Sequence, residues 1–107
     1  GVIGAMAEQQ QLDDKFFDRA DAHIHLSNDQ LVDATAGKVS ASMMYGTARF
    51  NAWISASGFQ SGEEMAAKRE ETLEYFVTGY RQMLEANLDE YIQNFDAYMK
   101  TQNPKPA

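Results

Sequence analysis

The sequence predicts an all-α protein of three main helices, at about residues 13–35, 40–57 and 62–100, of which the third is much the longest. Apolar residues recur three and four positions apart through these stretches, which is the pattern of amphipathic helices. Both prolines lie beyond the last helical stretch, in the final residues Pro104 to Ala107. We expect the helices to form a bundle that a second chain completes.

The first helix is expected to begin with Asp13 and Asp14, whose carboxylates favour the positive end of the helix dipole. Gly37 has the position of a residue that ends a helix in a left-handed conformation. Two faces follow from the spacing. The apolar face holds Phe16, Ala20, Ile24, Leu31 and Ala34, with Phe17 at its edge, and the polar face holds Asp18, His25, Asp29 and Asp33.

The second helix is expected to begin near Ser40, with Val39 as the hydrophobic residue before the cap, and to end at Gly58. Arg49 is the only charged residue between Val39 and Gly62. A helix that is apolar or small on nearly every side is usually buried. We therefore expect this helix to be the central element, with one face of Met43, Phe50 and Ile54 and another of Ala48, Ala52 and Ala56.

The third helix is predicted to start at a capping box, in which Ser61 accepts the Glu64 N–H and Glu64 reaches back to the Ser61 N–H. Asn87 and Glu90 resemble a second, weaker cap, but the apolar phase continues through them, so one continuous helix is favoured, with any kink near Gly79 or Asn87. The apolar positions are Leu73, Phe76/Val77, Tyr80, Met83/Leu84, Leu88, Tyr91/Ile92, Phe95 and Tyr98/Met99.

This third helix would be roughly 58 Å long, whereas a domain of this size has a radius of gyration of about 13 Å. It would therefore extend beyond its own domain unless it breaks or finds a partner surface. We expect Leu84, Leu88, Tyr91 and Phe95 to be buried, either against the first helix or across a homodimer.

Composition limits the class of protein. The chain of 107 residues is expected to be one helical domain at 12–100, with a flexible lead-in at 1–11 and a flexible tail at 101–107. Nine basic residues scattered among sixteen acidic ones give a net charge of −7, which disfavours binding to nucleic acid or an anionic membrane. Cysteine is absent, and no apolar run approaches the ~20 residues of a membrane span. A cytoplasmic protein is expected.

A metal site is the first possibility for chemistry. His23 and His25 are two residues apart and so lie on nearly opposite sides of a helix. Asp21, His25 and Asp29 share a face and could form half of an oxygen and nitrogen site. However, the Glu-x-x-His motif of di-iron bundles is absent. The sequence predicts no metal and no cofactor.

A ligand pocket is the second possibility, with Arg49, Asn51 and Trp53 as its candidate residues. A buried guanidinium needs a partner, so we expect Arg49 to be shielded and paired with a carboxylate, of which Asp18 and Asp21 are the nearest by pattern. The pair could be purely structural. Alternatively, Arg49 could hold an anionic group against a Trp53 wall.

Three segments resemble a bacterial family known as domain of unknown function 3144. They are FDRADAHIHL at 17–26, KVSASMMYGTARFNAW at 38–53 and GEEMAAKREE at 62–71. The resemblance extends from about Asp14 to Met99. It implies a small bacterial helical protein and brings no catalytic residues with it.

These observations favour a non-enzymatic interaction or regulatory module that forms a homodimer. No phosphate-binding loop or nucleophile elbow is present, although the sequence leaves enzymatic activity open. The alternative is a protein that binds a small anionic ligand through Arg49 and Trp53, or a metal through the Asp21/His25/Asp29 face.

Overall fold

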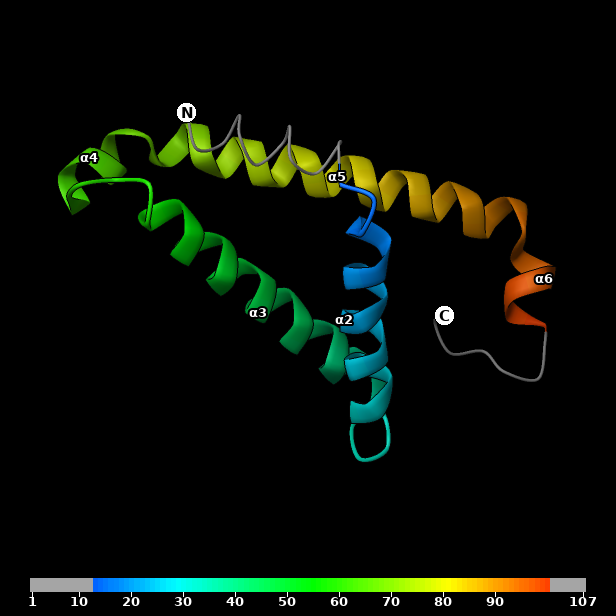
Figure 1. The fold of residues 1–107 in the computed structure, drawn as a ribbon. Coiled ribbons are helices and arrows are strands. Elements are labelled where there is room, and N and C mark those ends of the chain that lie inside the picture. The colour runs from blue at the N-terminus through cyan, green and yellow to red at the C-terminus, as the bar shows by residue number, and fades with distance from the viewer. Residues whose placement is uncertain (1–12, 101–107) are drawn as a thin grey trace. The chain divides into compact units, whose positions relative to one another are not determined.

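The computed structural model describes residues 13–100, and this part of the chain is all-α, as the sequence predicts. Five helices follow one another, and residues 13–100 contain no strand (Figure 1). The predicted lead-in at 1–11 and tail at 101–107 lie outside the described residues. The fold divides into two units between Met65 and Ala66, and each unit is described by itself. The helices are α2 (Phe16–Gln30), α3 (Ala36–Ala56), α4 (Gly62–Ala67), α5 (Arg69–Gln93) and α6 (Phe95–Met99).

Helix α2 and the turn at 31–34 that follows it keep the two faces predicted for the first helix, although the helix itself is shorter than predicted. The side chains of the apolar face are all half-buried, whereas Phe17 at its edge is 75% exposed and the four polar-face residues are exposed. Near its start, Asp13 accepts the backbone N–H of Lys15 at 2.8 Å and forms an ion pair with Arg19. These two contacts lower the pKa of the Asp13 carboxyl, with the Arg19 hydrogen bond as the larger cause. The helix ends at Gln30, and residues 31–34 turn the chain into α3.

Helix α3 begins four residues before the predicted start. Thr35 is its N-cap, in an extended conformation with φ −71° and ψ 156°, and its hydroxyl accepts the Lys38 N–H at 3.3 Å. Gly37 therefore lies in the first turn of α3 and does not terminate α2. No glycine among residues 13–100 has a positive φ. The prediction of a start at Ser40 was wrong because Thr35 supplies the same capping oxygen earlier in the chain.

The expectation that α3 is buried on two sides was also wrong. Only its ends hold buried side chains, Val39 at 6% and Ser55 at 3% exposed. Helix α2 meets α3 close to their connection, where the Ser27 hydroxyl donates to Met43 Sδ at 3.4 Å, and the two helices then diverge (Figure 1). One side of the later part of α3 is left uncovered, and the side chains of Phe50 and Trp53 there are more than 60% exposed.

The capping box before α4 forms with one difference. The Ser61 hydroxyl accepts the Glu64 N–H at 3.1 Å, as predicted. The Glu64 carboxylate reaches back one residue further than expected and accepts the Gln60 N–H at 3.0 Å. Two N–H groups that precede the first helical hydrogen bond are thereby satisfied.

Helix α5 is continuous through Gly79 and Asn87, which confirms the favoured alternative at Asn87. The Asn87 side-chain amide donates to the Met83 carbonyl at 2.7 Å, so it joins the helix and does not cap a new one. The predicted single helix over 62–100 is nevertheless interrupted at Lys68 and Asn94. Asn94 has φ −117° and ψ 30°, and both its backbone and side-chain amides donate to the Glu90 carbonyl at 3.0 Å. This competition from an asparagine side chain is a known way to end a helix.

We expect Thr35→Ala to lower the free energy of unfolding by about 1 kcal/mol, because it removes the oxygen that caps α3. Thr35→Ser keeps that oxygen and should stay close to the parent protein. Urea melts of both variants measure the difference. If Ser40→Ala were the more destabilising change, α3 would begin near Ser40.

Candidate functional site

The three candidate ligand residues on α3 do not converge on one site. Arg49 and Trp53 are four residues apart on one side of the helix, whereas Asn51 lies on the opposite side. The Asn51 side chain is half-buried, and its backbone carbonyl accepts the hydroxyl of buried Ser55 at 2.7 Å. Asn51 is therefore separated from the Arg49 and Trp53 side of α3.

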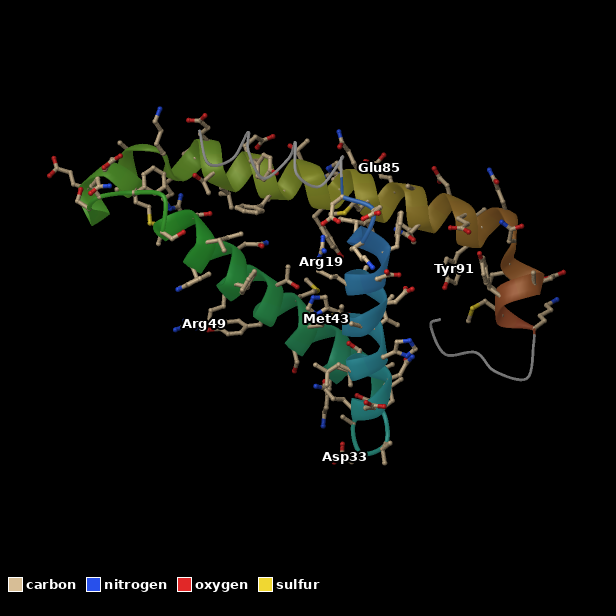
Figure 2. The ribbon with its side chains drawn as sticks, viewed as in Figure 1. Arg19, Asp33, Met43, Arg49, Glu85 and Tyr91 are labelled. Carbon is tan, nitrogen blue, oxygen red and sulfur yellow. The ribbon has the colours of Figure 1, made fainter. Side chains whose placement is uncertain are left out.

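Arg49 is exposed and projects from α3 on the side away from α2 (Figure 2). In the described part of the chain no carboxylate lies within ion-pair distance of it. The expectation of a shielded Arg49 paired with Asp18 or Asp21 was therefore wrong. Both aspartates are exposed on α2, and α2 has diverged from α3 at this level (Figure 1).

Two aromatic residues extend the Arg49 surface. Tyr45 lies four residues before Arg49 on the same side of α3 and is 68% exposed. Phe50 packs against Trp53 with ring centroids 5.8 Å apart. Tyr45 was not among the predicted site residues, although its spacing of four from Arg49 and eight from Trp53 places it on the same side of the helix. Together these side chains form an open, aromatic surface with one cation.

The metal-binding alternative has its residues on one helix. Asp21, His25 and Asp29 all lie on α2 and are exposed. Across residues 13–100 no three carboxylate or imidazole side chains are placed to hold one metal ion. The geometry thus gives the Asp21/His25/Asp29 face no convergent ligand set.

A row of exposed apolar side chains runs along one side of α5. We call it the α5 stripe and define it by six residues, each three or four positions from the next and each between 37% and 52% exposed. Its flanks add exposed Met83 and Ile92, and Phe95 follows at the start of α6. No helix in residues 13–100 has the length and hydropathy needed to cross a bilayer. The α5 stripe consists of Leu73, Val77, Tyr80, Leu84, Leu88 and Tyr91.

The residues predicted to form a buried core on the third helix are exposed in the single chain. Leu84, Leu88, Tyr91 and Phe95 were predicted to be buried, yet they are 41%, 52%, 37% and 53% exposed in the single chain. Phe76, also in the predicted pattern, is half-buried. Burial of the four across a homodimer stays a prediction.

The junction of α5 and α6 is held by aromatic and polar contacts. The rings of Tyr91 and Tyr98 stack with centroids 4.5 Å apart, and the Tyr98 hydroxyl donates to Glu90 Oε1 at 2.6 Å (Tyr91 is labelled in Figure 2). This hydrogen bond to a carboxylate raises the pKa of Tyr98, because ionisation would place two negative charges together. The contact orients α6 against the end of α5, and nothing in it resembles a catalytic pair in a cleft.

Exposure of Arg49 changes the expected effect of replacing it. Arg49→Met should alter the free energy of unfolding by less than about 0.5 kcal/mol, as at an ordinary surface site. Urea melts provide the measurement. A loss on the order of 3 kcal/mol, typical of a broken buried pair, would show that Arg49 is covered in the protein in solution.

Comparison with known proteins identifies the family. The family model described as protein of unknown function (DUF3144) matches residues 16–92. A solved structure, the NMR structure of the protein NB7890A from Shewanella sp., is 41% identical, covers 85% of this chain and 97% of its own, and superimposes with a TM-score of 0.70. No curated protein is significantly similar. The sequence resemblance is thus confirmed: the chain belongs to the DUF3144 family of proteins of unknown function.

Proposed function

We propose that this protein is a non-enzymatic interaction module that forms a homodimer through the α5 stripe. The observation that carries the proposal is the exposure of six large apolar side chains along one side of α5. Contiguous apolar surface of this kind is uncommon on monomeric proteins and usually marks an interaction site. A single helix cannot cover its own apolar side, so a partner surface is required.

The area of the α5 stripe fits a stable interface. Aromatic side chains present on the order of 200 Å² when free, leucine and valine somewhat less, and about half of each is exposed. The six residues therefore offer on the order of 600 Å², and the flanking Met83, Ile92 and Phe95 add about half as much again. Stable complexes bury about 800 Å² on each partner, so two copies of this surface would suffice.

The polar features of the chain support binding over catalysis. The displaced pKa values of Asp13 and Tyr98 arise from hydrogen bonds to exposed neighbours, Arg19 and Glu90. Catalytic groups are usually displaced by burial and by partners inside a cleft. The shifts at Asp13 and Tyr98 are therefore structural.

Leu88→Asp tests the dimer. The parent protein should have twice the 12.0 kDa mass of one chain at tens of micromolar in light scattering, and Leu88→Asp should be a monomer because it places a charge in an apolar interface. Gln82→Asp is the matched control. It adds the same negative charge, but Gln82 is exposed on the opposite side of α5. A monomeric parent, or equal masses for the two variants, would refute the proposal.

A second candidate function is anion binding at Arg49 and Trp53. It is favoured by the exposed guanidinium, which has no carboxylate partner within residues 13–100 and lies beside Trp53. Because Trp53 is the only tryptophan, its fluorescence should change in a saturable way with inorganic phosphate at constant ionic strength. Arg49→Met should abolish the change. An unresponsive parent, or a response that persists in Arg49→Met, would exclude Arg49 as an anion site.

A further inference from the structure

We infer that two copies of α5 pair in antiparallel orientation about a twofold axis at Leu84. The inference rests on the proposed self-association and adds its geometry. Three observations carry it: the symmetry of the α5 stripe, the sizes of the side chains it would bring together, and two charges along one of its edges.

Spacing within the α5 stripe is symmetric about Leu84. Tyr80 and Leu88 lie four residues before and after Leu84, and Val77 and Tyr91 lie seven residues before and after it. Leu73 lies eleven residues before Leu84. Eleven residues make three turns of 3.67 residues each, close to the 3.6 of an α-helix. The α5 stripe therefore runs almost parallel to the helix axis and can meet a copy of itself along its whole length.

An antiparallel pair about Leu84 matches large side chains with smaller ones. Tyr80 would face the partner's Leu88, and Val77 would face the partner's Tyr91. Leu84 would face the partner's Leu84. Each layer away from the axis joins one aromatic and one aliphatic side chain, which gives even packing. A parallel pair would place each residue opposite itself, with Val77 against Val77 in one layer and Tyr against Tyr in two others.

Two charges favour the same orientation. Arg81 and Glu85 are four residues apart, so they lie along one edge of the α5 stripe, and both are exposed. The ion pairs of residues 13–100 include Lys68–Glu71 and Lys100–Asp96 at similar spacings but not Arg81–Glu85. In an antiparallel pair like edges face each other. Arg81 then lies about 3 Å along the axis from the partner's Glu85, and two such pairs form around the twofold axis.

Alignment of the helix dipoles agrees with this arrangement. Each helix end carries about half a charge. Antiparallel packing therefore places the positive end of one α5 beside the negative end of the other. Parallel packing would bring like ends together.

Cysteine cross-linking tests the orientation, because the chain has no cysteine of its own. Leu84→Cys should form an intermolecular disulfide on mild oxidation, seen on a non-reducing gel. Val77→Cys alone should not, since its two copies would be about 21 Å apart along the axis, far beyond the ~7 Å Cα limit for a disulfide. A mixture of Val77→Cys and Tyr91→Cys chains should cross-link. A Val77→Cys homodimer would show a parallel pair, and a dimer without a Leu84→Cys cross-link would show another register.

Charge exchange gives a test that leaves the apolar surface intact. Arg81→Glu should raise the dimer dissociation constant about tenfold, as expected for losing two exposed pairs. Exchange of both residues, Arg81→Glu with Glu85→Arg, should restore it to within about threefold. An exchange variant as weak as Arg81→Glu would overturn the inferred orientation. A parent that is monomeric in light scattering would instead refute the proposed function, so the two failures are distinguishable.

Discussion

An α-helix presents side chains on every side, so a helix whose apolar residues share one side needs another surface to cover them. This constraint applies to α5, whose 25 residues carry the α5 stripe. Local hydrogen bonds and good helix formers keep such a helix continuous, but most helical stability in water comes from packing an apolar side. Burial of the half-exposed Leu84 and Leu88 against another surface would therefore stabilise α5.

In the unit that contains α2 and α3, the two helices cover part of each other's apolar side chains and leave the rest exposed. Its two helices share the Ser27–Met43 contact and half-buried residues on one side of α2. Beyond that contact α3 diverges, so Phe50 and Trp53 stay exposed. Helices of 15 and 21 residues that meet near one end cover only part of each other. A single cation, Arg49, then sits among exposed aromatic side chains without a carboxylate partner in residues 13–100.

Features set by neighbouring residues were predictable from the sequence, and those set by tertiary packing were not. The Ser61 cap, the faces of α2 and the continuity of α5 through Asn87 all depend on residues within about one turn. The start of α3 was misplaced because serine and threonine are both favoured N-cap residues, and the sequence contains Thr35 as well as Ser40. Arg49 burial depended on the path of α2, which apolar spacing does not encode. Grouping Asn51 with Arg49 in one pocket was a separate error, because a spacing of two residues already puts them on opposite sides of a helix.

The interruption at Asn94 has a consequence for the reach of the apolar surface. Phe95 and Met99 follow Leu84 and Leu88 at a distance of eleven residues, so the sequence keeps its helical phase across the break. Two hydrogen bonds to Glu90 oppose this continuity. The Asn94 side-chain amide donates to the Glu90 backbone carbonyl, and the Tyr98 hydroxyl donates to the Glu90 carboxylate. Glu90 thus accepts both of the hydrogen bonds that hold α6 at an angle to the end of α5. If its contacts were released, α5 and α6 would become one rod, and its apolar surface would lengthen by a full turn.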